Sequence, residues 1–371
     1  MTDVLLLGAG KIGAAISELL TATGDYTVTV GDSDPAMLDL LDVDRMRTEQ
    51  VDATKPADLD RALKGREIVI SALPYYLNPG VAEAARAAGA HYFDLTEDVE
   101  TTRRVRAIAD GAPVAFVPQC GLAPGFISIA AYDMAKRFDK LRNVWMRVGA
   151  LPQFPDNALK YNLTWSTDGL INEYCNPCDA IHDGRRIEVL PLEGLETFSL
   201  DGVDYEAFNT SGGLGTLAET LAGKVENLNY KTVRYPGHCA LMKMLVRDLR
   251  LGDRRELLKN VLETAVPMTK QDVVLVFVSV HGFKEGRLTQ ETYAKKIYSQ
   301  EVNGRLWSAI QITTAAGVTA MVDLLRAGRI PSKDFVRQED VALADFLANR
   351  FGRVYAIDAI ARRPPMLEAA E

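Results

Sequence analysis

Cysteine is scarce in this 371-residue chain, which contains four. So few thiols in so long a chain do not form the disulfide framework of a small secreted domain. Cys175 and Cys178 make a CxxC, but no second CxxC or histidine pair accompanies it to complete tetrahedral zinc coordination. The other two cysteines, Cys120 and Cys239, stand alone. We therefore expect a reducing compartment and no metal site.

Long apolar runs and an excess of positive charge are also missing. No segment reaches the ~18 consecutive apolar residues that a membrane helix needs, and residues 4–7 are too short a run for a signal peptide. The net charge is -8, so no overall basic surface favours contact with a phosphate backbone. We predict a cytoplasmic protein that binds neither nucleic acid nor a membrane.

The length and composition are those of a two-domain globular enzyme. Hydrophobic residues make up 47% of the chain and charged residues 25%, and a single core rarely grows beyond ~250–300 residues. The chain has no internal repeat or long linker. We predict a dinucleotide-binding domain over residues 1–124, a substrate domain over 125–305, and a C-terminal return over 306–371 that packs on the first domain.

A glycine motif opens the chain. Residues 4–7 form an apolar run typical of a central parallel strand, and Gly8, Gly10 and Gly13 follow at GxGxxG spacing. Apolar residues then recur at helical spacing, so the glycines lie between a strand and a helix N-terminus. In this context the first glycine makes the turn, the second lets the backbone approach a pyrophosphate, and the third allows close helix packing. The motif predicts a nicotinamide dinucleotide site.

An acidic residue ends the second predicted strand. Asp32 follows residues 26–30, about twenty residues beyond the glycines, where a carboxylate accepts hydrogen bonds from both ribose hydroxyls. A 2′-phosphate would meet like charge there, and no arginine follows closely in the sequence. We therefore predict NAD as the cofactor. The residues predicted to bind it are Gly8, Gly10, Lys11, Ile12, Gly13, Asp32, Asp52, Ala53, Ser71, Ala72, Leu73 and Leu95.

The rest of the first domain alternates between strand and helix patterns, which predicts a doubly wound parallel Rossmann sheet of the α/β class. Ligands bind outside the carboxyl ends of such strands, so residues 71–76, 94–97 and 120–125 should rim one site. The expected strands are 51–54, 68–70, 91–94 and 114–117, and the expected helices are 57–63, 79–88 and 97–109.

After residue 125 the pattern changes to that of an α+β domain with a mixed sheet. Two helical stretches, 307–325 and 340–351, then end the chain. The expected strands of this second sheet are 144–148, 159–165, 187–189 and 273–280.

Five segments of the chain carry a family resemblance. They are 8–13 (GAGKIG), 71–76 (SALPYY), 120–125 (CGLAPG), 169–174 (GLINEY) and 232–238 (TVRYPGH). Together they resemble the saccharopine dehydrogenase and lysine 6-dehydrogenase family. The resemblance spans most of the chain and implies an enzyme that oxidises an amine on the ε-carbon of a lysine skeleton, passing hydride to a nicotinamide. Residues 205–214, the short chain and Asp32 bring it closer to the lysine 6-dehydrogenase branch.

The implied chemistry calls for a few polar groups. An α-carboxylate needs a bidentate partner such as Arg234. The substrate ammonium needs carboxylates, and Asp94, Glu97 or water takes its proton before hydride leaves, while His238 is a candidate proton relay. Further hydrogen bonds to the substrate are predicted from Tyr76, Thr210 and Ser211.

Each of these residues also has a structural interpretation. Asp94 and Glu97 can cap or begin the following helix. Arg234 can pair with a surface carboxylate, and His238 can be a structural donor. Sequence alone does not decide between the two interpretations.

Three functions remain open from the sequence. The first is NAD-dependent oxidation of the ε-amine of L-lysine to the 6-semialdehyde, which cyclises to piperideine carboxylate, with release of ammonia. The second is saccharopine dehydrogenase, whose substrate has extra carboxylates and needs a second cation, for which Arg147, Lys160 and Lys243 are candidates. The third is a non-catalytic NAD sensor. We also expect a homodimer.

Overall fold

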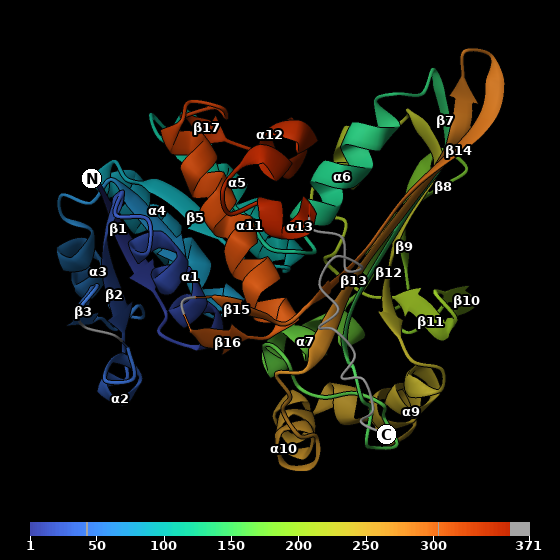
Figure 1. Cartoon of the computed structure of the whole chain (residues 1–371), viewed down its shortest axis with the longest axis horizontal. Helices are drawn as coiled ribbons and strands as arrows, with labels where there is room; N and C mark the ends of the chain where they lie inside the picture. Colours follow the sequence, from blue (N-terminus) through green and yellow to red (C-terminus); the bar gives the residue numbers. More distant parts are fainter. Residues whose placement is uncertain (42–43, 303, 357–371) are drawn as a thin grey trace, which may run out of the picture.

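The structure, a computed structural model, describes residues 1–41, 44–302 and 304–356. A parallel sheet with its helices forms one side of the molecule, and a long mixed sheet forms the other (Figure 1). Helices α6 (Phe126–Ala135) and α11 (Ala309–Arg326) lie between the two sheets, where both contact the mixed sheet and α11 also packs on the first helix of the parallel domain. The main hydrophobic core therefore joins both halves.

The first sheet has seven parallel strands and the order of a doubly wound Rossmann fold, which confirms the predicted fold class. Its central strand is apolar on both faces, and residues 4–7 are buried. The strands in sheet order are β17 (Asp334–Phe335), β6 (Ala115–Val117), β5 (His91–Asp94), β4 (Ile68–Ser71), β1 (Thr2–Leu7), β2 (Tyr26–Asp32) and β3 (Arg47–Gln50).

Two sequence predictions in this domain are wrong. The strand expected over 51–54 ends earlier, at Gln50, and these residues form the turn that follows. The helix expected to begin at Glu97 begins at Val99, because the Asp98 side chain caps it by accepting from the Thr101 amide. Glu97 therefore lies in the loop before the helix. The helices of this domain are α1 (Lys11–Thr21), α2 (Pro35–Leu38), α3 (Pro56–Leu63), α4 (Asn78–Ala88) and α5 (Val99–Ala109).

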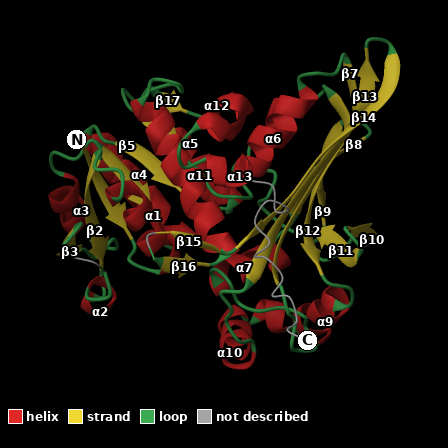
Figure 2. Cartoon of the chain, viewed as in Figure 1, coloured by secondary structure: helices red, strands yellow, loops and turns green. Residues whose placement is uncertain are grey.

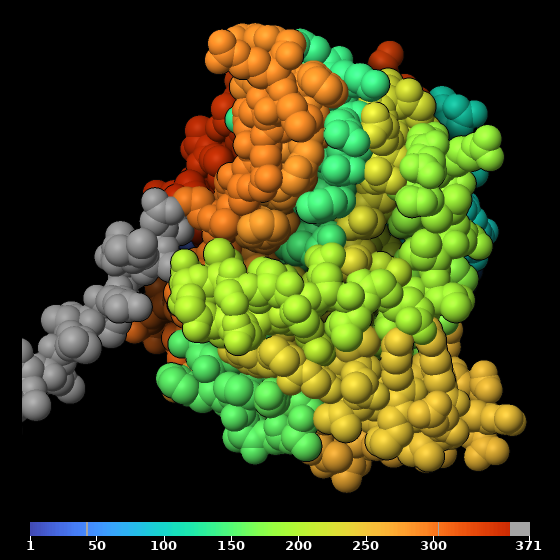
Figure 3. All heavy atoms as spheres, turned by 90° about the vertical axis from the view of Figure 1, so that its right-hand side faces the viewer, coloured from blue at the N-terminus to red at the C-terminus, as the bar shows by residue number. Residues whose placement is uncertain are grey.

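The second sheet is mixed, as predicted: β7 pairs with β12 in parallel and with β13 in antiparallel orientation. Figure 3 looks onto the face turned away from the Rossmann half, where β13–β14 (orange), β7 (green) and β12 (yellow) lie side by side. The main path of the sheet is β10 (Glu196–Leu200), β11 (Val203–Asn209), β12 (Val225–Arg234), β7 (Lys140–Pro152), β13 (Asp272–Lys284) and β14 (Arg287–Tyr298), and β8 (Cys178–His182) joins β12 to β9 (Arg185–Val189).

The segment 159–165, expected to be a strand, is instead an irregular stretch, buried over residues 161–164, with a single bridge from Leu163 to Met268. Its apolar side chains pack against helices of the second domain, and burial without strand pairing explains the misleading pattern. The helices and strands not yet named are α7 (Thr167–Cys175), α8 (Leu217–Thr220), α9 (His238–Lys243), α10 (Arg255–Ala265), α12 (Leu343–Ala348), α13 (Arg353–Ala356), β15 (Gln300–Val302) and β16 (Arg305–Trp307) (Figure 2).

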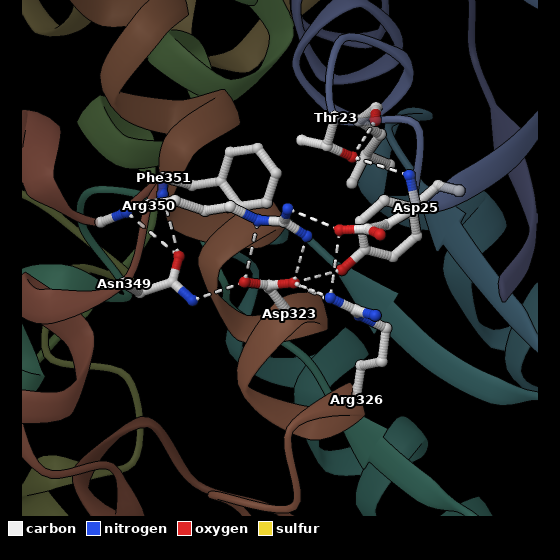
Figure 4. A network of polar contacts seen from close by, with 10 residues as sticks. Thr23, Asp25, Asp323, Arg326, Asn349, Arg350 and Phe351 are labelled. Carbon is white, nitrogen blue, oxygen red and sulfur yellow. Dashed lines mark hydrogen bonds and ion pairs between the residues drawn. The ribbon is translucent and has the colours of Figure 1, made fainter. Parts of the chain in front are cut away.

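The C-terminal segment lies against the Rossmann half. β17 adds to the edge of the parallel sheet, and Asp323 of α11 accepts hydrogen bonds from Tyr26 and Arg350, while Arg350 also pairs with Asp25 (Figure 4). Of the predicted return over 306–371, residues 357–371 lie outside the described residues. The helix expected over 340–351 is shorter than predicted and spans Leu343–Ala348. No helix in the described ranges is long and apolar enough to cross a membrane.

Candidate active site

In the glycine loop, Gly10 leaves room for a ligand, whereas Gly8 and Gly13 allow close packing of the backbone. A Cβ on Gly8, which has a φ of +102°, would lie 2.8 Å from the Ala72 carbonyl oxygen, and a Cβ on Gly13 would lie 1.9 Å from that of Gly8. A Cβ on Gly10 would meet nothing within 4 Å. Gly10 is also the N-cap of α1 and supplies no side-chain cap, so the first helix amides are available to an anion. This cradle fits the pyrophosphate of a dinucleotide.

Asp32, at the carboxyl end of β2, is tied to the same loop. One carboxylate oxygen accepts from the Ala9 amide at 2.7 Å and the other from the Asp34 amide at 2.9 Å. Each oxygen keeps a lone pair, so the group can still accept from ribose hydroxyls.

The other residues predicted to contact the cofactor fall into two groups. Ile12, Ala72, Leu73 and Leu95 line a cavity beside the loop, whereas Asp52, Ser71, Ala53 and Lys11 do not. Each of these four residues has other contacts. Asp52 accepts a hydrogen bond from Thr54 in a turn, and Ser71 donates one to Asn78. Ala53 packs beside the second core of the domain, and the Lys11 amine lies 3.2 Å from the sulfur of Met268.

The cavity has a volume of about 340 Å³ and lies between the two domains. Three of its walls are the loops after β4, β5 and β6, the strand ends where the crevice rule places a ligand. The remaining walls come from α7, β7, β12 and the start of α11. The lining residues most used below are Tyr75, Glu97, Trp165, Asp168, Glu173, Tyr230 and Arg234.

Two carboxyl groups in the cavity are held in an environment that disfavours their charge. Glu97 is partly exposed as a residue, but its Oε1 atom is buried and accepts no hydrogen bond within the described chain. Burial, together with the charge of Asp98, raises the pKa of Glu97 to about 7. Glu173, on α7, is 5% exposed, and burial raises its pKa to about 8 against the opposing effect of Arg234. Both groups can exchange protons near neutral pH.

One buried cation faces these acids. Arg234 is 3% exposed, and no carboxylate of the described residues lies within ion-pair distance of it. Its Nε donates to the Tyr174 hydroxyl at 3.1 Å, and its Nη1 donates to the Val233 carbonyl at 2.8 Å. A third carboxylate in the cavity, Asp168, is paired with Lys259 at 2.8 Å. Arg234 is therefore the cation placed to receive an anionic ligand group.

Several predicted site residues lie outside the cavity lining. Asp94 is fully buried, and its carboxylate accepts from the Tyr92 hydroxyl and from the amides of Thr96 and Gln119. These bonds hold the loop that carries Glu97, so Asp94 supports the site without facing the cavity.

The remaining predicted substrate contacts point elsewhere. Tyr76 is 63% exposed, whereas its neighbour Tyr75 lines the cavity. Thr210 is buried and does not line the cavity, and Ser211 donates to the Pro177 carbonyl. His238 is 1% exposed and makes hydrogen bonds through both ring nitrogens; burial and the charge of Arg234 lower its pKa to about 3. A group with that pKa does not relay protons near neutral pH.

Sequence reasoning missed Glu173 as a site residue. It belongs to a helix in which every residue from Thr167 to Tyr174 except Asp168 is buried, and a glutamate on such an apolar helix is the available signal. The loop at Gly212 and Gly213 was also missed. A Cβ on Gly212 would lie 2.2 Å from the Glu97 carbonyl oxygen, and one on Gly213 would lie 2.2 Å from the ring of Tyr230. Both glycines are needed for this loop to hold the cavity walls together.

The cysteines take no part in the cavity lining. All four are free thiols, and burial raises the pKa of Cys178 to about 12. Within the described ranges, no group of three or more His, Cys, Asp or Glu side chains is arranged to hold a metal ion.

Comparison with known proteins identifies matches over nearly the whole chain. A family model described as the saccharopine dehydrogenase NADP binding domain matches residues 4–116, and one described as the saccharopine dehydrogenase C-terminal domain matches residues 121–353. The mitochondrial alpha-aminoadipic semialdehyde synthase of Rattus norvegicus is 26% identical over 66% of this chain, a match that covers 28% of that protein.

A yeast enzyme is similar in both sequence and structure. The NADP(+)-dependent, L-glutamate-forming saccharopine dehydrogenase of Saccharomyces cerevisiae is 26% identical over 66% of this chain and 57% of its own length. The chain thus spans less than two thirds of either relative. The solved apo structure of the L-Glu-forming saccharopine dehydrogenase from S. cerevisiae aligns with a TM-score of 0.75 and 18% identity, covering 93% of this chain and 96% of that one. At this identity the likeness shows a shared fold.

Proposed function

Because the chain belongs to the saccharopine dehydrogenase family, we propose that it oxidises the ε-amine of L-lysine with NAD to an imine. Water then hydrolyses the imine to the 6-semialdehyde, which cyclises to piperideine carboxylate, and ammonia is released. The two matching family models confirm the family resemblance found in the sequence. The choice of lysine within the family rests on the charges that face the cavity.

The observation that carries the proposal is one unpaired guanidinium opposite two buried carboxyl groups. Arg234 matches a single α-carboxylate. Glu97 and Glu173 match the two amino groups of lysine. A substrate with one carboxylate and two amines therefore offers a partner to each of these three side chains.

Saccharopine is the second candidate, favoured by the names of the curated relatives. It has three carboxylates, but Arg234 is the one Lys or Arg among the described residues that line the cavity. The additional cations suggested by the sequence are engaged elsewhere: Arg147 with Glu196, Lys160 with the Pro236 carbonyl, and Lys243 with Glu193. The charge balance supports lysine over saccharopine.

The side chains of the cavity supply proton transfer and orientation. NAD, when bound, accepts a hydride from the carbon that bears the amine. An ammonium group must first lose a proton, and Glu97 is our candidate base because its pKa of about 7 leaves it largely ionised in mildly alkaline solution. Arg234 orients the substrate through its carboxylate, and Tyr75 and Trp165 line the cavity with aromatic surface.

The cofactor preference is tested at Asp32. We propose NAD, although the matching family model and the yeast relative are named for NADP, because the Asp32 carboxylate at the loop repels a 2′-phosphate. Replacing Asp32 with Ala removes this repulsion and should lower the preference for NAD over NADP by roughly 10–100-fold, where each factor of ten corresponds to about 1.4 kcal/mol. Measured kcat/KM values for both cofactors check this. An unchanged ratio would contradict the assignment.

One assay separates the candidate functions. The purified protein is mixed with NAD and either lysine or saccharopine, and nicotinamide absorbance, ammonia and glutamate are followed. Ammonia formed from lysine in step with reduced cofactor supports the proposal. Glutamate formed from saccharopine identifies the second candidate, and tight NAD binding without turnover identifies a sensor.

The homodimer and the cytoplasmic location stay predictions. Sedimentation equilibrium of the purified chain tests the first. Fractionation of the source cells tests the second.

A further inference from the structure

Arg234 is held by a directed chain of hydrogen bonds that ends in a backbone carbonyl. The Nδ1 atom of His238 lies 2.9 Å from the Leu159 carbonyl oxygen, which can only accept, so Nδ1 carries the proton. In the neutral ring Nε2 is then an acceptor, and it lies 3.0 Å from the Tyr174 hydroxyl. Tyr174 therefore donates to His238, and its oxygen accepts from Arg234 Nε at 3.1 Å.

This arrangement leaves no alternative protonation pattern that satisfies every atom. With a charged His238, or with the other tautomer, the Tyr174 oxygen would face two N–H donors and its own proton would lose its acceptor. Arg234 sits 4.9 Å from the centre of the Tyr161 ring, which supports the guanidinium from one face. The side chain is thus held by a hydrogen bond to α7, a hydrogen bond to its own strand and a ring contact with Tyr161.

The free donors of Arg234 face the cavity that it lines. A guanidinium has five N–H donors, and the bonds to Tyr174 and Val233 use two of them, leaving three. Resting on the proposed function, we propose that Tyr174 and His238 are positioning residues that hold Arg234 for bidentate binding of the substrate's α-carboxylate. In this assignment His238 is a fixed neutral acceptor instead of the proton relay expected from the sequence.

Helix α7 serves one end of the substrate. Glu173 and Tyr174 are consecutive on α7, so the carboxyl group that meets an amine and the hydroxyl that steers Arg234 move as one body. Since Glu97 is assigned to the reacting amine, Glu173 is left for the α-amine, which shares a carbon with the carboxylate that Arg234 binds. The class of ligand at this end of the cavity is an α-amino acid.

The first test compares lysine with 1,5-diaminopentane, which has the same amines and no carboxylate. Tyr174→Phe should lower kcat/KM for lysine roughly 10–30-fold, mainly through KM, and change that for the diamine by less than about twofold, as expected for a neutral hydrogen bond that supports a charged one. His238→Leu should act in the same way, while His238→Gln, which can present an acceptor oxygen to Tyr174, should restore part of the loss. Tyr235→Phe is the matched control, because that hydroxyl donates to the Pro152 carbonyl instead.

A second measurement keeps the inference separate from the proposed function. Norleucine has the backbone of lysine without the reacting amine, so its calorimetric Kd reports the carboxylate site whether or not lysine is turned over. Tyr174→Phe should weaken norleucine about tenfold and leave NAD affinity unchanged. Nitrogen-15 NMR of the full chain should show His238 as the neutral Nδ1–H tautomer. Equal losses for lysine and the diamine, unchanged norleucine binding in Tyr174→Phe, or an Nε2–H tautomer would each overturn the inference.

Discussion

The two sides of the cavity are built in different ways. On the Rossmann side the backbone makes the cofactor cradle: Gly8 and Gly13 allow close contacts that a Cβ would block, and helix α1 presents its first amides, while the loop after β5 adds the Glu97 side chain. On the side of the second domain the site is made of buried side chains, Glu173 and Arg234, which stand among apolar neighbours. The first side is specified by local spacing and the second by which distant segments meet.

This difference has an energetic consequence. The glycine loop lies in contacts that also stabilise the folded domain, so its geometry favours both folding and binding. Buried ionisable groups favour binding but cost stability, because charge is taken out of water without a partner. The second-domain wall, which consists of Glu173 and Arg234, should therefore cost more folding stability than the glycine loop. A substitution that disturbs the packing of the glycine loop should therefore lower stability. Replacing a buried ionisable group of the second-domain wall with a neutral one should instead raise stability while it lowers activity.

The largest expected effect is that of Glu97→Gln on catalysis. The amide keeps the shape of the side chain but cannot accept a proton from the substrate ammonium, and loss of a general base costs ~10²–10⁴ in rate. We expect kcat with lysine to fall about 10³-fold while NAD binding is retained. Steady-state kinetics and NAD titration measure the two quantities.

The control for this variant is Glu100→Gln, two residues inside the next helix. Glu100 is exposed and pairs with Arg103 on the surface, so its loss should change kcat by less than about twofold, as for other exposed pairs. A Glu97→Gln enzyme with more than half of the wild-type kcat would show that another group takes the proton. Glu97 would then not be the residue through which the Rossmann side contributes to catalysis.

The Rossmann side is also the part that the sequence predicted best. The apolar run before Gly8 and the spacing of the three glycines are local signals, and β1, α1 and β2 lie where they predict. Asp32 belongs to the same local unit, because its position at the end of β2 follows from the strand pattern. A βαβ unit is specified within about thirty residues, so periodicity is enough to find it.

The second-domain wall was harder to predict because its members come from distant segments. Glu173 and Arg234 are 61 residues apart, and only the folded chain shows that they line one cavity. Asp94 and His238 were expected to take part in proton transfer because they are titratable groups in the right segments, yet each has its hydrogen bonds satisfied by protein atoms. A sequence reveals a residue's chemistry but not whether neighbours already use it.

The next effect in size compares two glycines of one loop. Gly13→Ala puts a Cβ 1.9 Å from a backbone oxygen that cannot move alone, so we expect a loss of about 3 kcal/mol in the free energy of unfolding. Gly10→Ala meets no atom within 4 Å and has a φ of -68°, which alanine adopts easily. It should change stability by less than about 1 kcal/mol and weaken NAD roughly tenfold by blocking the approach of the pyrophosphate.

Urea unfolding without cofactor and calorimetric titration with NAD measure these two quantities. Tight NAD binding by Gly10→Ala would show that the open side of the loop is not the phosphate cradle. Wild-type stability in Gly13→Ala would show that α1 can shift away from Gly8, contrary to the packing described above.

The smallest expected effect tests the cost of the second-domain wall through the pH dependence of stability. Burial raises the pKa of Glu173 from 4.5 to about 8, so between these values the folded state keeps a proton that the unfolded state has lost. Stability must then fall as pH rises through this window, by at most about 1.4 kcal/mol per pH unit. Glu173→Gln removes this dependence because the amide does not titrate.

We expect the Glu173→Gln variant to gain about 2 kcal/mol in the free energy of unfolding, relative to the wild type, between pH ~5 and pH ~8. Urea unfolding at both pH values measures this gain, and exposed Glu188→Gln is the control. Parallel pH curves for wild type and Glu173→Gln would mean that the acid is already ionised and paired in the folded protein, and that the second-domain wall is no costlier than the glycine loop.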